Sequence, residues 1–181
     1  MDYQIDKMVG DGNTHRFVLA SKCTTPMVVI GVNPSTANEC IPDPTVRKVM
    51  RFAELGNYDG FVMLNLYAQR ATKFNDVHKK KDEKLHQGNL DAIREYFKPH
   101  DELTILAAWG DLIDEREYLL DCLRDIVNVL LERKRRVRWK QIGELTKAGH
   151  PRHPLYACYN IGLKNFDVDC YLSTHRSKKQ Y

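Results

Sequence analysis

Short apolar segments that end at small or polar residues recur along the chain, and they predict its strands. The run 27–35 begins apolar and stops at Gly, Asn and Pro, and the runs 61–66 and 103–108 also end at polar or small residues. Continuous apolar runs of this length are typical of strands that are covered on both faces. Residues 137–142 form a fourth, weaker strand, and residues 15–20 alternate like an edge strand or part of a hairpin.

Amphipathic helices are predicted between these strands. One begins with Asp43 as its N-cap and Pro44 as its first residue, and it ends at Gly56. Apolar residues at helical spacing mark two more helices, over 85–97 and 112–133. Strands that alternate with helices favour an α/β fold. We expect three layers, α/β/α, around a central, mainly parallel four-stranded sheet.

The chain of 181 residues is predicted to be one domain, 1–181, with a short flexible tail at about 173–181. No apolar run approaches the roughly 20 residues needed to cross a bilayer, so we expect no membrane partner. The first residues have neither the basic region nor the apolar core of a secretory signal. Five scattered cysteines without a C-x-x-C pair are interpreted as reduced thiols, which favours a cytoplasmic location.

The charge of the chain permits a polyanionic partner. The formal net charge is +4, and the cations concentrate in three segments, 79–81, 133–140 and 176–179. Taken one at a time, such runs are usually solvated surface. Together they are candidates for a rim that contacts phosphates.

Two residues are candidates for chemistry at the carboxyl edge of the predicted sheet, where open α/β folds place their ligands. Asn33 follows the first buried strand and can read a base edge or orient a water molecule. His153 lies in a stiff Pro-Arg-His-Pro segment, and its imidazole can donate to a carbonyl oxygen on which negative charge develops. Each also has a structural interpretation, because either side chain can instead satisfy local backbone groups.

Other side chains near this edge are candidates for binding. Arg47 and Arg70 can contact phosphate or carboxylate through a planar fork, or can form surface ion pairs. Tyr67, Trp109 and Tyr156 can stack on a base, although an aromatic residue after a buried strand is more often part of the core.

Several common sites are absent from the sequence. The histidines do not form a metal-ligand motif, so we expect no metal. The chain has neither the G-x-x-x-x-G-K-S/T motif that binds nucleoside triphosphates nor the G-x-G-x-x-G motif that binds dinucleotides. It also lacks the G-x-S-x-G elbow of serine hydrolases. We therefore expect no cofactor.

Taken in order, the segments I-G-V-N-P-S, L-N-L, A-A-W-G and H-P-L resemble the motifs of the uracil-DNA glycosylase superfamily. The G-V-N-P run is similar to G-I-N-P-G and G-M-N-P-G of its mismatch-specific and single-strand-selective branches, and Asn33 falls on the catalytic Asn. More closely, G-V-N-P-S-T-A, D-P-T-V-R, N-L-Y-A-Q-R-A-T, A-W-G and G-H-P-R-H-P-L-Y resemble an uncharacterised bacterial and phage family over about residues 16–156.

The superfamily resemblance implies a four-stranded parallel sheet between helices and hydrolysis of an N-glycosidic bond without a cofactor. A flipped base would lie beside Asn33, His153 would donate to its carbonyl, and Leu155 or Tyr156 would wedge into the base stack. Ser35 stands where the superfamily motif usually has Gly. The residues expected to contact the substrate are Gly31, Val32, Pro34, Ser35, Asn65, Arg70, Trp109, Gly110, Leu155 and Tyr156. Arg47, Lys147 and Arg152 are expected at the DNA backbone.

The leading hypothesis is a DNA glycosylase-like enzyme that acts on uracil, a mismatched base or a modified pyrimidine. A second hypothesis is a nucleic-acid or nucleotide-binding module that has kept the pocket and lost turnover. A third is an enzyme that modifies bases or nucleotides in phage modification or counter-defence. In all three, the partner is DNA or a nucleobase or nucleotide ligand.

Overall fold

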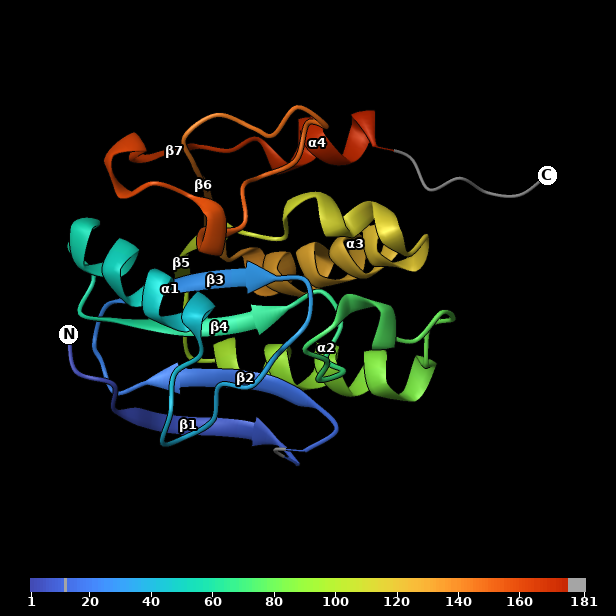
Figure 1. Cartoon of the computed structure of the whole chain (residues 1–181), viewed down its shortest axis with the longest axis horizontal. Helices are drawn as coiled ribbons and strands as arrows, with labels where there is room; N and C mark the ends of the chain where they lie inside the picture. Colours follow the sequence, from blue (N-terminus) through green and yellow to red (C-terminus); the bar gives the residue numbers. More distant parts are fainter. Residues whose placement is uncertain (12, 176–181) are drawn as a thin grey trace.

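The computed structural model describes residues 1–11 and 13–175 of the chain. Within these residues seven strands form one sheet in the order β1-β2-β4-β3-β5-β6-β7 (Figure 1). The strands are β1 (Ile5–Gly10), β2 (Arg16–Ser21), β3 (Pro26–Gly31), β4 (Gly60–Asn65), β5 (Glu102–Ala107), β6 (Arg136–Ile142) and β7 (Leu163–Asn165).

The sheet is mixed. Strands β4, β3, β5 and β6 pair in parallel, whereas β1, β2 and β7 are added at the two sides by antiparallel pairing. The α/β class is confirmed, but the expected four-stranded sheet is too small. β1 and β7 were not predicted, because β1 has no buried residue and is interrupted by Asp6 and Lys7, and β7 has only three residues.

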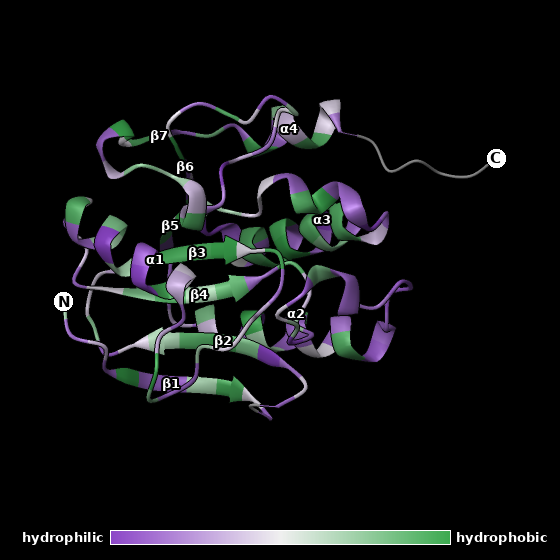
Figure 2. Ribbon diagram, viewed as in Figure 1, coloured by the Kyte–Doolittle hydropathy of each residue, from purple (hydrophilic) through white to green (hydrophobic). Residues whose placement is uncertain are grey.

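Helices cover both faces of the sheet. They are α1 (Pro44–Leu55), α2 (Glu83–Phe97), α3 (Tyr118–Leu131) and α4 (Val168–Thr174). α1 packs on one face with Met27, Val29 and Phe61, and α2 and α3 pack together on the other face (Figure 1). Figure 2 shows that the hydrophobic residues concentrate in the central strands and in α3. Two apolar layers therefore hold the parallel strands between them.

Short 3-10 helices complete the chain: η1 (Phe74–Asp76), η2 (Gly110–Glu115), η3 (Glu132–Lys134), η4 (Pro154–Tyr156) and η5 (Tyr159–Ile161). The predicted helix 112–133 is wrong at its start, because residues up to 115 belong to η2 and α3 begins at Tyr118. Gly110 has φ +62° and turns the chain out of β5 into η2.

The two ends of α1 follow the sequence prediction. The Asp43 side chain accepts from Val46 N at 2.9 Å, Pro44 is the first residue, and Gly56 follows the last turn. The predicted flexible tail is wrong for residues 173–174, because they form the end of α4. Residues 176–181 lie outside the described part of the chain.

The parallel strands β3 and β5 are neighbours, but the segments that follow them leave in opposite directions. β3 leads to α1 on one face of the sheet, and β5 leads to α3 on the other. A divergence of this kind is the place at which open α/β sheets form the crevice that binds their ligands. Ile30 pairs with Ala107, so Asn33 and Gly110 each lie three residues beyond a registered pair.

Among the described residues, every helix is too short or too polar to cross a membrane. The apolar faces of the helices are turned to the sheet instead.

The stability of this fold depends on the buried face of α3, and two leucines on that helix test it. Leu123 is fully buried and Leu131 is 49% exposed. We expect Leu123→Ala to lower the free energy of unfolding by about 2–5 kcal/mol, because it leaves a cavity between α3 and the sheet. Leu131→Ala should cost less than about 1 kcal/mol. Urea denaturation followed by circular dichroism measures both, and equal losses would contradict the packing described for α3.

Candidate functional site

Asn33 lies immediately beyond β3, and its side chain is bonded to the backbone of the same edge. The Nδ2 atom donates to Ala71 O at 2.9 Å and to Pro34 O at 3.1 Å. Both amide hydrogens are therefore used. The Oδ1 atom has no donor among the described residues, and the side chain is partly exposed. Asn33 thus fixes the loop, as its structural interpretation requires, and still offers a hydrogen-bond acceptor.

His153 is held in place next to the end of β5. It precedes η4, and its Nδ1 atom accepts from Leu155 N at 3.3 Å. Gly110 N donates to Pro151 O at 2.9 Å. A Cβ atom on Gly110 would lie 3.1 Å from the Cβ of His153, so glycine at position 110 permits both the positive φ and the close approach of the histidine.

The imidazole of His153 is neutral at pH 7. Burial lowers its pKa from 6.5 to about 4, and the opposing effect of the nearby Asp43 carboxylate is smaller. Because Nδ1 accepts a hydrogen bond, the proton of the neutral ring is on Nε2. That N–H has no partner among the described residues. His153 therefore offers a hydrogen-bond donor, whereas Asn33 offers an acceptor.

A pair of arginines contacts the loop that follows Asn33. Arg16 Nη1 and Arg70 Nη2 both donate to Ala37 O, at 2.6 and 2.9 Å. Arg70 precedes Ala71, whose carbonyl accepts from Asn33. Arg16 begins β2, which runs antiparallel to β4 and so starts at the carboxyl edge of the parallel strands.

Asp43 connects the arginine pair to His153. Its Oδ2 accepts from Ala37 N at 3.3 Å, and its charge acts on the pKa values of both Arg16 and His153. The carboxylate is 7% exposed. The structure thus brings the two predicted catalytic residues to one edge of the sheet, bordering the loop from residue 33 to residue 43.

Sequence reasoning missed Arg16 and gave Asp43 only a capping role. Arg16 is 2% exposed, and burial, reinforced by the charge of Arg70, lowers its pKa to about 10. An arginine at the head of a strand normally points to solvent, so the sequence held no signal of its burial. The capping position of Asp43 was recognisable, but its proximity to His153 depends on the tertiary fold.

The stacking role considered for Trp109 is wrong. The residue is fully buried, its Nε1 donates to the Tyr171 hydroxyl at 3.2 Å, and its ring packs edge-on against Trp139 and Phe166. Tyr67 is also fully buried, with its hydroxyl 2.8 Å from His78 Nδ1. Neither ring has a free face for a base, because both fill the core below α3.

Asn65 supports the site from within. It is 1% exposed, and its backbone oxygen accepts from Asn89 Nδ2 at 3.0 Å. With its amide nitrogen turned to the backbone oxygens, Asn65 donates to Asn33 O at 3.2 Å. Its side chain is therefore a positioning group below the loop. Three other residues predicted to contact the substrate are buried at this edge, namely Gly31, Val32 and Pro34. Ser35 is partly exposed.

The remaining predicted residues lie at the surface of the same region or close to it. Tyr156 is 83% exposed, and its ring centroid is 5.8 Å from that of His153. Leu155 is partly exposed, and Arg47 and Lys147 are exposed. Arg152 is bonded to the protein itself: its Nε donates to Glu144 O at 2.8 Å. This bond holds the loop between residues 144 and 152.

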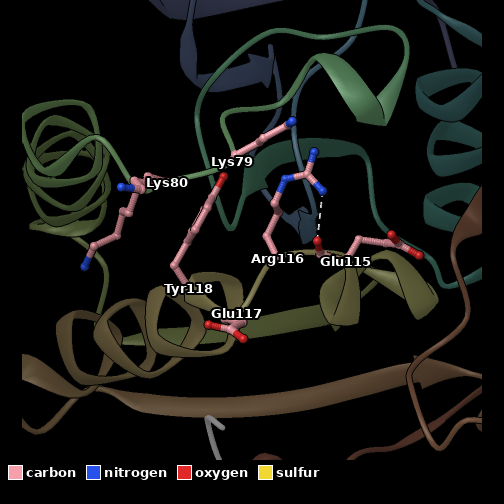
Figure 3. Close-up of a pocket in the computed structure, with 7 residues that line it drawn as sticks. Lys79, Lys80, Glu115, Arg116, Glu117 and Tyr118 are labelled. Carbon is pink, nitrogen blue, oxygen red and sulfur yellow. Dashed lines mark hydrogen bonds between the residues drawn. The ribbon is translucent and has the colours of Figure 1, made fainter. Parts of the chain in front are cut away.

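A basic hollow of about 510 Å³ lies between the segments that lead into α2 and α3 (Figure 3). Arg116 donates to the carbonyls of Val77 and His78, at 3.0 and 3.2 Å, and Tyr118 OH also donates to His78 O at 2.7 Å. These bonds fix the loop that precedes the lysines. The residues lining the hollow are Lys79, Lys80, Lys81, Glu115, Arg116, Glu117 and Tyr118.

No cluster of three or more His, Cys, Asp or Glu side chains suited to a metal ion occurs among the residues that the structure describes. The candidate site is therefore a set of hydrogen-bonding and cationic groups at the ends of β3 and β5.

The chain belongs to a family described as "Protein of unknown function (DUF1643)", which it matches over residues 16–155. The matched segment begins at Arg16 and ends two residues after His153, so it includes both predicted catalytic residues and the arginine pair. Comparison with curated proteins gave no match, and comparison with solved structures gave none.

The neutral state of His153 can be tested by its titration. The ring signals should move with a midpoint near pH 4, against 6.5 for an ordinary histidine. Above pH 6.5 the folded and unfolded chains both hold this ring neutral. As the pH is lowered from 6.5 to 4, the ring takes up its proton in the unfolded chain before it does so in the folded chain. The free energy of unfolding therefore decreases, by up to about 3 kcal/mol.

NMR titration of the histidine ring protons measures the midpoint, with His153→Gln to assign the signal. Urea denaturation at pH 7 and pH 4.5 should show a smaller pH dependence in His153→Gln than in the wild type. A His153 midpoint at or above 6.5 would contradict the burial described for the ring.

Proposed function

We propose that the chain binds a nucleobase in the crevice between β3 and β5 and hydrolyses the N-glycosidic bond of that base. The observation that carries this proposal is the neutral His153, fixed beside Gly110 with its Nε2–H unpartnered among the described residues. The resemblance of the motifs to the uracil-DNA glycosylase superfamily supports the same activity.

The two groups at the crevice match the edge of a pyrimidine lactam. Such an edge has a carbonyl oxygen next to an N–H group, and it needs one donor and one acceptor. His153 Nε2–H is a donor, and Asn33 Oδ1 is an acceptor because the Asn33 amide hydrogens are bonded to Pro34 O and Ala71 O. Asn33 therefore acts by accepting, either from the base or from the attacking water.

The chemistry requires stabilisation of a departing base. When the N-glycosidic bond breaks, both of its electrons pass to the base nitrogen and are shared with the carbonyl oxygen. A neutral donor placed at that oxygen stabilises the anion in a site of low dielectric constant. Water then adds to the sugar carbon and its proton passes to the base anion, which gives the free base and a sugar hydroxyl. A water molecule held by Asn33 Oδ1 is oriented for this attack.

A neutral imidazole suits this role. With its pKa near 4, His153 stays an Nε2–H donor throughout the neutral pH range, and it carries no charge that would have to be desolvated in the crevice. The carboxylate of Asp43 is near enough to influence its pKa, but both carboxylate oxygens already accept from backbone N–H groups. Asp43 is thus a positioning group at the site.

A base inside a strand reaches such a crevice only after it has flipped out of the stack. The exposed Tyr156 beside His153 is placed to fill the space that the base leaves. The lysines of the basic hollow lie at the same edge of the sheet and can contact the phosphates of the strand (Figure 3). We therefore infer DNA as the substrate, with the base removed from it.

Removing either group at the crevice should lower the rate of base release. We expect Asn33→Ala and His153→Ala each to reduce it by at least about tenfold, which corresponds to roughly 1.4 kcal/mol of lost transition-state stabilisation. The assay uses single and double strands that contain uracil, mispaired thymine or hydroxymethyluracil, followed by alkaline cleavage.

Asn128→Ala is the matched control, because Asn128 is exposed near the end of α3 that leads into the start of β6, at the opposite edge of the sheet from both residues. Full activity of both site variants would remove their assigned roles. If the wild type releases none of these bases and still binds DNA, the alternative of a binding module without turnover is favoured.

The basic hollow makes a separate prediction about DNA binding. Lys79 and Lys80 are exposed and make no ion pair with a described residue. If each contacts a phosphate, the double variant Lys79→Ser/Lys80→Ser should lower the slope of log K against log salt by about 1–2. Fluorescence anisotropy with a labelled strand measures this slope. Lys22→Ser, at the opposite edge of the sheet, should leave it nearly unchanged, and an equal effect of both variants would exclude a local contact.

A further inference from the structure

We propose that Arg16 and Arg70 form a phosphate subsite of the crevice, whose place is taken by the Ala37 carbonyl in the ligand-free chain. Both guanidinium groups donate to that single oxygen, at 2.6 and 2.9 Å. This inference adds an anionic part to the proposed nucleobase substrate, and it depends on the proposed function only for the identity of the ligand.

The hydrogen bonding of the arginine pair is incomplete. Arg16 Nε and Arg70 Nη1 are buried, and neither has a partner in the described part of the chain. A buried donor without a partner costs about 1–3 kcal/mol, and more when it carries charge. One carbonyl oxygen has two lone pairs, which Nη1 of Arg16 and Nη2 of Arg70 already occupy. An acceptor with more oxygens could bond the Nη1–Nη2 end of Arg70 and so satisfy its unpartnered Nη1.

The charge of the pair points in the same direction. Two guanidinium groups lie close enough for Arg70 to lower the pKa of Arg16, and the carboxylate that acts on Arg16 is Asp43. Both oxygens of Asp43 are engaged with the backbone, at Ala37 N and Val46 N. The buried Arg16 and the partly exposed Arg70 therefore face one carboxylate with which neither makes a hydrogen bond in the described part of the chain. A dianionic or monoanionic ligand would balance this charge.

Phosphate is the anion that fits this arrangement. Two planar forks that converge on one point can each bond to two oxygens of a tetrahedral group. The pair also lies beside the proposed base site, because Arg70 adjoins Ala71, the residue that accepts from Asn33. A nucleotide whose base reaches Asn33 would carry its phosphate close to the base, at about the position of Arg70.

The Ala37 carbonyl must move for a phosphate to enter. The segment 36–42 that carries it is held at few points, among them Asp43 Oδ2 on Ala37 N and the Tyr3 hydroxyl, which donates to Asn38 O. Ile41 in this segment is 62% exposed, and Asn38 N donates to Ile41 O at 3.1 Å. A ligand that displaces the carbonyl should therefore loosen the backbone of the segment.

The test measures the binding of three probes by isothermal titration calorimetry. The probes are inorganic phosphate, thymidine 5′-monophosphate and a short single strand that has only internal phosphodiesters. In the wild type at least one probe should bind, and Arg70→Gln should weaken that binding at least tenfold. Arg70→Lys, which keeps the charge and loses the fork, should fall between the two. Arg51→Gln, on the exposed face of α1, is the control and should bind like the wild type.

The three probes also distinguish the source of the phosphate. Tighter binding of the monophosphate indicates a free nucleotide, and tighter binding of the strand indicates a phosphodiester. The proposal is overturned if no probe binds, or if Arg70→Gln binds the best probe as tightly as the wild type. Base release is not part of the readout, so a protein that binds phosphate and cleaves nothing supports the subsite and contradicts only the proposed hydrolysis.

Hydrogen exchange in the wild type tests the subsite without any variant. The amide of Asn38 should exchange faster when the best probe is bound, because its segment is released from the arginine pair. Unchanged or slower exchange of residues 37–41 at saturation would show that the carbonyl keeps its place, and it would contradict the proposed displacement.

Discussion

The bonding of Ala37 is the constraint on which the geometry of the crevice depends. Its carbonyl accepts from Arg16 and Arg70, and its amide donates to Asp43, so one residue ties the start of β2, the loop after β4 and the N-terminus of α1 together. Asp43 in turn caps α1. Because these elements meet beside the carboxyl end of β3, this junction fixes the loop that follows Asn33, on the arginine side of the site.

The chemical character of the site follows from how its two partly exposed groups are held. Asn33 is fixed through its nitrogen, which leaves an acceptor, and His153 is fixed through Nδ1, which leaves a donor. The backbone assigns these roles, since every partner is a main-chain group. Burial then keeps the imidazole neutral. A crevice with one donor, one acceptor and a nearby pair of cations is suited to a polar heterocycle that carries phosphate.

Much of this could be predicted from the sequence, and the rest depends on tertiary contacts. Apolar runs revealed β3, β4 and β5, and Asp43 and Pro44 revealed the start of α1. Strands β1 and β7 were missed because β1 has no buried residue and β7 has only three residues. At the site, Asn33 and His153 were recognisable from their motifs, but the burial of Arg16 was not, since a lone arginine at a strand start has no local signature. Trp109 was a candidate both for stacking and for the core, because sequence does not show which strand-end aromatic faces the core, and the structure places it in the core.

The central claim is that Asn33 Oδ1 and His153 Nε2–H contact one base between β3 and β5. A crystal structure of the chain with whichever of uracil, thymine and hydroxymethyluracil it binds most tightly tests this most directly. The account predicts a carbonyl oxygen of the base within about 3 Å of His153 Nε2 and an N–H or a bound water at Asn33 Oδ1. A base bound elsewhere, or a His153 ring whose Nε2 faces away from it, would contradict the account.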